Sequence, residues 1–516
     1  MKGFRIIALM LALLLLSGCG ATAPAEDSAF GDTVEIVLSD TTVTVDGTAA
    51  ATEETAAVYL ASDIVYYEDG HDFTYGEGTA EEAHSADEAA AHRVVHITEK
   101  GSYRLSGTLS CGQIAVDLGE SAKDDPEAVV TLILDGVDIT CTVAPAIIFY
   151  NVYECGSSDA PTKDVDTAAA GANLVIADDS VNTVYGSHVA RIYKADSVVL
   201  NEEGTEVEEA KKLHKYDGAV YSRMSMNVSG GERGNGTLGI HADNEGMDTE
   251  MHLTVNGGEI AIYSGNDGIN TNEDGVSVTT VNGGVLSITV TGDTGEGDGI
   301  DSNGWLVING GTVMTAACGN SADAGIDSDM GIYINGGTVV ASGHMLDRIE
   351  AGGQTYAVFS FPQTQRGGSE LVLENGGGEV VFTAAPQNDY SVLILSSPAM
   401  TEGSYTLKQD GQPLSVMSGG MGGFGGMRPS DGGEFTLPEG MERPEDREPP
   451  AGFEPPAGFE QPEGMMPPGD MVRPGDREFP AGDGRGGMGG AAVIGEAVTE
   501  FTLTSGGNML TVMMEK

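Results

Sequence analysis

The stretch VNGGEIAIYS, residues 255–264, decides the fold, because its NGG tripeptide returns three more times at a nearly constant spacing. The four copies begin at Asn256, Asn282, Asn309 and Asn335, in steps of 26, 27 and 26 residues. Each copy precedes a short run of alternating apolar residues, which is the period of a β-strand. Repetition at this spacing is typical of stacked structural units, so the sequence predicts a solenoid of short strands.

A second motif, acidic–Gly–apolar–Asp/Asn, precedes each NGG. Its versions are EGMDT from Glu245, DGINT from Asp267, DGIDS from Asp298 and AGIDS from Ala324. Glycine next to Asp or Asn favours turns, so we predict an acidic turn in every unit. Equivalent residues of stacked units lie about 4.7–4.9 Å apart, and the turns should therefore place their carboxylates in rows.

These rows are predicted to bind calcium. The candidate ligands are Asp248, Asn270, Asp301 and Asp327 in one row and Asp243, Asp267, Asp298 and Asp323 beside it. Two unit charges about 4 Å apart repel by about 1 kcal/mol in water and about 4 kcal/mol at an effective dielectric of about 20. Calcium takes about six to eight oxygen ligands and would neutralise the rows, whereas magnesium prefers to keep its waters. The alternative is that these residues only bond backbone N–H groups in solvent-facing turns.

The overall charge limits the choice of partner. The 516 residues include 24 basic and 79 acidic side chains, for a net charge of −55. Such a surface repels nucleic acid and attracts cations. Hydrophobic residues form 40% of the chain and glycines number 76, which favours a thin core with many tight turns. We expect a monomer with no nucleic-acid partner.

The first residues have the features of a targeting segment. Lys2 and Arg5 precede the apolar run 6–16, which is too short for a membrane span. The run ends in LSGC, which resembles the lipobox of bacterial lipoproteins and implies cleavage after residue 18 and lipidation of Cys19. The expected location is the extracellular face of the cytoplasmic membrane, with the lipid as anchor. The alternative is an ordinary cleaved signal peptide with an incidental cysteine.

Composition divides the rest of the chain into segments. They are a signal peptide (1–18), a tether (19–31), the solenoid (32–346) with an insert (48–92), a β-hairpin cap (347–416), a Met/Gly/Pro-rich disordered loop (417–495) and final strands (496–516). The cap is expected because an open solenoid end exposes unpaired strand edges. The Met/Gly/Pro-rich loop has too few apolar residues to form a core.

Histidines and cysteines give weaker signals. His92 and His96 have the i, i+4 spacing of a helical metal site, but HRVVHIT is better interpreted as a strand without convergent acids. The four later cysteines, Cys111, Cys141, Cys155 and Cys318, lack metal-site spacing. We interpret them as buried apolar residues, with a Cys111–Cys141 bridge as the alternative.

The sequence predicts no catalytic residues. Residues 234–347 contain sixteen acidic side chains and no lysine or arginine. Pectate-lyase chemistry needs a strong base, and Arg223, Arg233 and Arg348 lie only at the borders of this region. No GxSxG, P-loop or HExxH motif is present. A lyase or hydrolase on the same scaffold is the alternative, although pairs of acids are expected by chance here. A structural adhesin or spacer is a third interpretation.

Several segments resemble a known family. They are LSGTLSCGQIAVD, LILDGVDIT, NLVIADDSVNTVYG and DGAVYSRMSMNVSGGERGNGTLGI, followed by the DGI(N/D) and NGG repeats. Their order is similar to that of the bacterial carbohydrate-binding domain-containing proteins, a cellulose- and pectin-binding β-helix family, over about residues 33–47 and 93–415. The resemblance implies a right-handed parallel β-helix with bound calcium, surface display and polysaccharide binding without established catalysis. The insert 48–92 and the Met/Gly/Pro-rich loop depart from the family pattern.

We therefore expect a cell-surface lipoprotein that binds acidic (uronate) or cellulosic polysaccharide. Calcium could bridge protein carboxylates to uronate carboxylates and so overcome their repulsion. A neutral sugar would instead need an aromatic platform, for which Tyr263, Trp305 and Tyr333 are the candidates within the repeats. Such residues also serve as core or edge packing.

Overall fold

The structure is a computed structural model that describes residues 32–156, 161–418 and 497–513. Within these residues the fold is all-β, as the sequence predicts, and its single α-helix is α1 (Ala86–Ala91). No helix in the described ranges has the length and apolar character needed to cross a membrane. The predicted signal peptide with Cys19, the tether and nearly all of the Met/Gly/Pro-rich loop fall outside the described residues.

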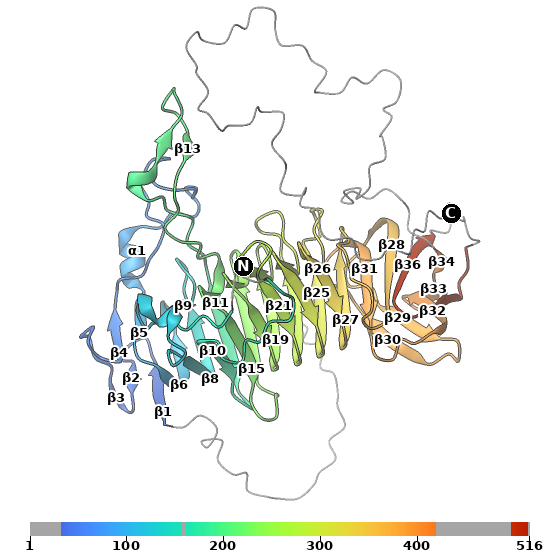
Figure 1. Ribbon diagram of the computed structural model, residues 1–516, viewed down its shortest axis with the longest axis horizontal. Helices are drawn as coiled ribbons and strands as arrows, with labels where there is room; N and C mark the ends of the chain where they lie inside the picture. The colour runs from blue at the N-terminus through green and yellow to red at the C-terminus, as the bar shows by residue number, and fades with distance from the viewer. Residues whose placement is uncertain (1–31, 157–160, 419–496, 514–516) are drawn as a thin grey trace, which may run out of the picture. The chain divides into compact units, whose positions relative to one another are not determined.

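Most strands belong to three parallel ladders (Figure 1). The first ladder contains β1 (Thr33–Leu38), β6 (Gly101–Leu109), β8 (Val130–Thr140), β10 (Ala172–Ile176), β15 (Met226–Gly230), β18 (Leu253–Val255), β21 (Val278–Val281), β24 (Trp305–Ile308) and β26 (Gly331–Ile334). The second contains the end of β8, then β11 (Val181–Gly186), β16 (Thr237–Ala242), β19 (Glu259–Ser264), β22 (Val285–Val290), β25 (Thr312–Ala316) and β27 (Thr338–Gly343). The third contains β5 (Arg93–Ile97), β7 (Gly112–Asp117), β9 (Ile147–Asn151), β14 (Gly218–Ser222), β17 (Glu245–Thr249), β20 (Ile269–Thr271) and β23 (Ile300–Ser302).

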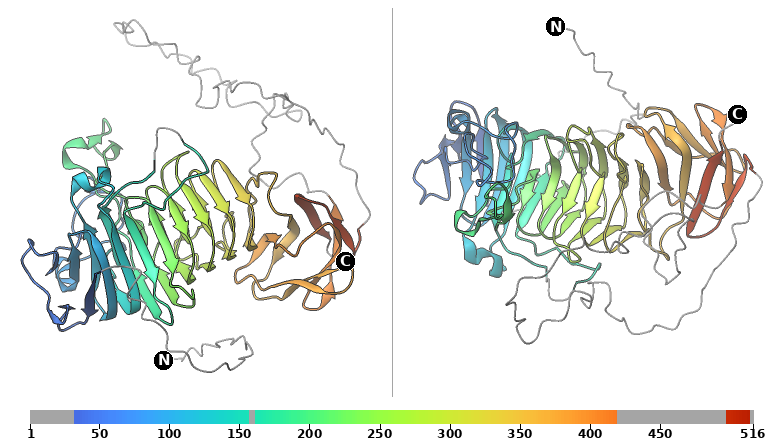
Figure 2. Two further views of the ribbon diagram at one scale, coloured as in Figure 1. Left: turned by 60° about the horizontal axis from the view of Figure 1, so that its bottom comes forward. Right: turned by 90° about the horizontal axis from the view of Figure 1, so that it is seen from above.

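The chain visits the ladders in a fixed rotation. From β14 to β25 it passes through the third, first and second ladders in turn, and each return adds a strand beside the previous one (Figure 2). In the first ladder, Leu253 pairs with Thr279 and Thr279 with Leu306, so the NGG spacing is one full circuit of the chain. The core lies between the ladders, where the alternating apolar residues of each strand are buried.

The acidic motif differs from its predicted form. It forms strands β17, β20 and β23 of the third ladder rather than turns between two strands. Two of these strands have three residues each, too short for an alternating pattern to stand out against Gly and Asp. The circuit therefore contains three strands instead of two. Asp248 and Asp301 lie on strands of the third ladder, whereas Asp267 and Asp298 come just before β20 and β23, and the fourth copy, residues 324–328, forms no strand.

The second glycine of each NGG is fixed by geometry. Gly284 has φ of +82°, and a Cβ atom there would lie 2.6 Å from the carbonyl oxygen of Gly258 in the preceding circuit. Gly275 has a similar φ of +67°, but no atom lies within 4 Å of its Cβ position. The repeated glycine thus serves two needs, a left-handed backbone and close approach of successive circuits.

Alanine variants separate these two needs. Gly275→Ala should lower the free energy of unfolding by about 1–2 kcal/mol, the strain of the left-handed backbone alone. Gly284→Ala should lower the free energy of unfolding by a further amount of about 1–3 kcal/mol, because the added methyl group overlaps the neighbouring backbone. Urea denaturation of both variants measures the difference. Equal losses would mean that close approach does not constrain the NGG turn.

Beyond β27 the pairing becomes largely antiparallel. β31 (Tyr390–Ser396) pairs antiparallel with β27 and with β28 (Tyr356–Gln365), while β36 (Gly507–Met513) joins β28 in parallel and β34 (Ser415–Ser418) antiparallel. A separate sheet contains β29 (Leu371–Asn375), β30 (Val380–Ala384), β32 (Gly403–Gln409), β33 (Gln412–Pro413) and β35 (Phe501–Leu503). A second hydrophobic cluster, around Phe359, Tyr390 and Phe501, lies between these strands. The edge of the second ladder at β27 is thereby covered.

Smaller elements occur near the N-terminal end and in one excursion. They are β2 (Thr44–Val45), β3 (Thr48–Ala49) and β4 (Val58–Ala61), together with the pair β12 (Val199–Leu200) and β13 (Val207–Glu209). β4 pairs antiparallel with β5 at the end of the third ladder. Helix α1 begins after Ser85, whose side chain accepts a hydrogen bond from the Glu88 N–H.

Candidate functional site

The third ladder brings one row of the predicted acidic residues into register. Asp248 pairs with Asn270, and Asn270 pairs with Asp301. The Asp327 N–H donates to the Ile300 carbonyl at 2.7 Å, which continues the register to a fourth circuit. These residues come from four segments spread over 80 positions of the sequence.

The neighbouring row differs from the predicted one. The Gly246 N–H donates to the Asp267 carbonyl and the Gly268 N–H to the Asp298 carbonyl, both at 3.0 Å. This register places Glu245, Asp267 and Asp298 in one row, because parallel pairing aligns the residues just before each donor. Asp243 is exposed outside the row, and Asp323 Oδ2 instead accepts the Gly297 N–H at 2.7 Å. Glu245 is the first residue of its acidic motif, as Asp267 and Asp298 are of theirs, so aligning the motifs would have identified it.

Three of the aspartates form a tight group. Asp298, Asp301 and Asp327 each offer a carboxylate oxygen, and these oxygens all lie within 4.8 Å of one another. Within the described ranges, no lysine or arginine forms an ion pair with any of the three. The nearest arginine in sequence, Arg348, pairs with Glu350 at 2.6 Å. The group therefore concentrates negative charge without a basic side chain to balance it.

Burial and mutual repulsion change the protonation of this group. Burial, reinforced by the charge of Asp267, raises the pKa of Asp298 to about 9. Burial also raises the pKa of Asp301 to about 6, with Asp329 adding repulsion, and that of Asp327 to about 7, with Asp347 adding repulsion. Each shift reflects the difficulty of holding a negative charge away from water beside other negative charges.

The geometry fits a calcium-sized ion. Two oxygens that each lie about 2.4 Å from one calcium ion can be at most about 4.8 Å apart, and the three carboxylates meet this limit. The donors are all hard oxygens, with no histidine or cysteine in the group. Asp347 lies close enough to raise the pKa of Asp327, and its buried Oδ2 atom has no hydrogen-bond partner in the part of the chain that the structure describes.

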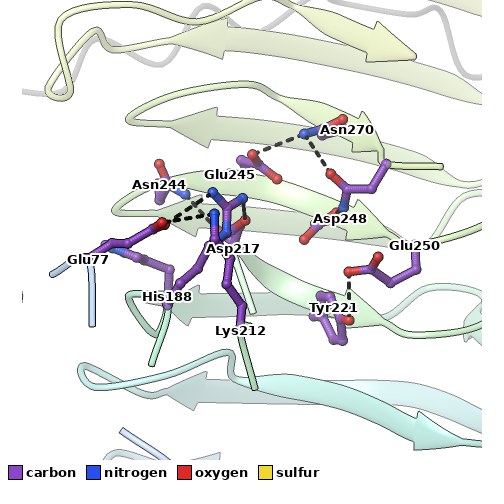
Figure 3. Close-up of polar contacts among 12 residues, drawn as sticks. Glu77, His188, Lys212, Asp217, Tyr221, Asn244, Glu245, Asp248, Glu250 and Asn270 are labelled. Carbon is purple, nitrogen blue, oxygen red and sulfur yellow. Dashed lines mark hydrogen bonds and ion pairs between the residues drawn. The ribbon is translucent and has the colours of Figure 1, made fainter. Parts of the chain in front are cut away.

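A second acidic group lies further along the same ladder (Figure 3). Glu245 Oε2, Asp248 Oδ2 and Asn270 Oδ1 are all buried and lack hydrogen-bond partners among the described residues. The remaining oxygens of the two acids are bonded: Asn270 Nδ2 donates to Glu245 Oε1 at 3.1 Å and Asn272 Nδ2 to Asp248 Oδ1 at 2.5 Å. Three unpartnered oxygens in one buried region are unusual, because buried polar atoms are normally bonded.

The two acids of this group face strong desolvation. Burial raises the pKa of Glu245 well above its ordinary value, and repulsion from Asp248 raises it further. The pKa of Asp248 rises for the same reasons, burial first and then the charge of Asp217. The Arg191 guanidinium donates to Asp217 Oδ2 at 2.8 Å and is therefore already engaged with a neighbouring carboxylate.

The predicted aromatic platform is divided between two ladders. Tyr263 lies on β19 and is 45% exposed. Its ring stacks on His241 with centroids 5.1 Å apart, and His241 stacks on Tyr185 at 4.4 Å. The rings face one another along the ladder, so both faces of His241 are covered and Tyr263 uses one of its faces in this stack.

Trp305 and Tyr333 lie on the first ladder instead. Trp305 is half-buried at the start of β24. The Lys163 ammonium lies 5.0 Å from the centroid of the Tyr333 ring, on a segment about 170 residues earlier in the chain. The three candidates therefore do not form a single platform.

The histidine pair and the cysteines do not form sites. His96 Nε2 bonds Asp63 Oδ1 at 2.8 Å, whereas His92 ends α1 with its Nδ1 atom 2.9 Å from the Glu88 carbonyl. The strand prediction for HRVVHIT is correct from Arg93 onward. None of the four described cysteines forms a disulfide, which excludes the Cys111–Cys141 bridge in this structure, and Cys141 and Cys318 are buried.

Comparison with known proteins identifies the class. A family model described as carbohydrate-binding domain-containing protein matches residues 91–356, just over half of the chain. The chain belongs to this family, which confirms the resemblance expected from its motifs. Membership implies a carbohydrate partner and is consistent with a non-catalytic binding role.

One curated relative supports the same assignment. A carbohydrate-binding domain-containing protein of Acetivibrio thermocellus is 29% identical over 175 residues, which are 34% of this chain and 46% of the relative. The match thus spans about half the length of that relative. No solved structure matches the chain.

Proposed function

We propose that this chain is a lipid-anchored, cell-surface protein that binds polysaccharide through a right-handed parallel β-helix stabilised by calcium. Membership of the carbohydrate-binding family is the observation that carries the polysaccharide part. The rotation through three parallel ladders supports the helix, and the general preference for right-handed crossovers supports its hand. The LSGC sequence ending at Cys19 supports the anchor.

The proposed role of calcium is structural. Asp298, Asp301 and Asp327 would hold one ion, and Glu245, Asp248 and Asn270 would hold another through their unpartnered oxygens. A bound cation would supply positive charge beside carboxylates that form no ion pair with a lysine or arginine among the described residues. Neutralising the carboxylates would hold the strands of the third ladder in place. The first and second ladders, which belong to the same circuits, would then keep a fixed strand spacing toward a glycan.

The proposed ligand is a cellulosic or uronate-bearing polysaccharide. An ion held by partly exposed carboxylates, such as Asp298 and Asp301, retains positions for outside oxygens, including a uronate carboxylate. A lyase role receives less support. Arg233 pairs with Asp178 and Asp179, which raises the pKa of Arg233, and Arg348 pairs with Glu350. Arg233, with its raised pKa, is a poor general base.

Retention on insoluble polysaccharide tests the proposal. The full chain should be retained on cellulose or cross-linked polygalacturonate in calcium-containing buffer. Excess chelator should reduce retention several-fold if calcium rigidifies the coils. Chitin serves as a control for non-specific adsorption. Equal recovery in the flow-through from every matrix, with and without calcium, would rule out the polysaccharide-binding function.

A further inference from the structure

The outward face of the first ladder carries a groove that no acidic motif predicted. The groove has a volume of about 440 Å³, within the size range of small-molecule sites. Its floor lies over β15, β18, β21 and β24, and its wall is the segment 163–168 (β15 and β21 are labelled in Figure 1). The wall is anchored at Thr167, whose Oγ1 lies 2.8 Å from Asn227 Oδ1 and 2.7 Å from Thr254 Oγ1.

The asparagines of the four NGG motifs form a ladder along this groove. Asn282 Nδ2 donates to Asn256 Oδ1 at 2.9 Å, Asn309 to Asn282 at 2.9 Å and Asn335 to Asn309 at 2.8 Å. All four side chains are exposed. Mutual hydrogen bonds hold each carboxamide in one orientation, so a ligand does not have to order them.

The asparagine ladder leaves a regular set of polar atoms for a ligand. A carboxamide has two N–H donors and two acceptor lone pairs. Asn282 and Asn309 each use one donor and one acceptor within the ladder. One donor and one acceptor per circuit therefore remain, repeated at the strand spacing of about 4.8 Å. A sugar hydroxyl both donates and accepts, and a linear glycan presents such groups at regular intervals.

The charge of the groove selects against acidic sugars. Among the described residues of the lining, Lys163 is the one that is basic, and its ammonium group pairs with Asp164 Oδ1 at 2.5 Å. Asp166 adds a second carboxylate to the same wall. The lining thus carries more negative than positive charge, on a chain whose net charge is −55. A uronate chain would meet repulsion here, whereas a neutral chain would not.

We propose that this groove binds a neutral, hydroxyl-rich glycan that lies across successive circuits and hydrogen-bonds to the asparagine ladder. The inference rests on the proposed polysaccharide-binding function and specifies its site and ligand class. No aromatic side chain is among the described residues that line the groove, which leaves hydrogen bonding rather than aromatic stacking as the main contact.

Calorimetric titration of the full chain in calcium tests this site. The probes are cellohexaose, a neutral glycan, and hexagalacturonate, an acidic one. The double variant Asn282→Ala/Asn309→Ala should raise the Kd for cellohexaose by about tenfold or more, since it removes hydrogen bonds on two circuits. Thr280→Val, a near-isosteric change on the groove floor outside the asparagine ladder, should raise the Kd by a smaller factor. Melting curves of both variants check that the fold is retained.

The matched control is Tyr263→Ala on the second ladder, which removes the competing aromatic candidate and should leave the Kd unchanged. An unchanged Kd in the folded Asn282→Ala/Asn309→Ala variant, or a loss only in Tyr263→Ala, would overturn the groove assignment. Tighter binding of hexagalacturonate than of cellohexaose by the wild type would overturn the neutral ligand class while leaving polysaccharide binding intact. If neither oligosaccharide nor either polymer bound, the proposed function itself would fail.

Discussion

In millimolar calcium, the chain should unfold at a clearly higher temperature than in excess chelator. A ligand that binds only the folded state adds about 2.7 kcal/mol per site when its free concentration is about one hundred times Kd. The expected effect is large because the ion would replace repulsion among Asp298, Asp301 and Asp327 with attraction. Differential scanning calorimetry with and without calcium measures it, and magnesium serves as the ion control.

A triple variant should change the melting temperature in opposite directions in chelator and in calcium. Asp298→Asn/Asp301→Asn/Asp327→Asn replaces three partly buried carboxyl groups, whose ionisation is made unfavourable by burial and repulsion, with neutral amides, so in chelator it should melt above the wild type. In calcium it should melt below the wild type, because the ion loses its ligands. Asp243→Asn is the matched control, since Asp243 is exposed outside both rows. A triple variant that loses stability equally in both conditions would indicate a structural role without a cation.

The chelated chain should become less stable as pH rises from about 4 to 9. Asp298, Asp301 and Asp327 have folded-state pKa values of about 9, 6 and 7, above the value of about 3.9 in an unfolded chain. Between these limits the folded state binds more protons than the unfolded state. The stability that these groups contribute is therefore fully present below about pH 4 and is lost as pH rises through the folded pKa values.

Saturating calcium should reverse this dependence. A bound ion favours the ionised carboxylates and lowers their folded-state pKa values, so stability is then lost as pH falls. Urea denaturation of the chelated and calcium-loaded chains at about pH 5 and about pH 8 compares the two slopes. The triple asparagine variant should show a weaker slope in chelator. A chelated wild type that gains stability between these two pH values would contradict the assigned environment of the aspartates.

The sequence predicts the repeating part of the fold well, because the NGG spacing depends on local chemistry. Gly284 needs a left-handed backbone and closeness to Gly258, and these needs recur in every circuit. The sequence predicts turns in place of the acidic strands, because β20 and β23 have three residues each, too few to show the apolar–polar alternation of a strand. The predicted place of Asp323 in the row is wrong because register depends on pairing between circuits. The Gly299 N–H donates to the Ala324 carbonyl, so Ala324 rather than Asp323 lies opposite Asp298.

Contacts between distant segments account for most of the rest. The wall of the groove reaches the NGG asparagines from residues 163–168, and no periodic signal in that segment indicates where it packs. Likewise, Tyr263 is a platform candidate only by its position within the repeats. Its stacking on His241 depends on the register of β16 and β19, which emerges only when the ladder is assembled.

The central claim is that buried carboxylates of the third ladder hold a cation that stabilises the coils. Anomalous diffraction from crystals grown with calcium tests it most directly. We predict an anomalous peak among Asp298, Asp301 and Asp327, with carboxylate oxygens at about 2.3–2.6 Å from its centre. Crystals in which these three carboxylates contact only one another and water, with no anomalous peak between them in millimolar calcium, would contradict the claim.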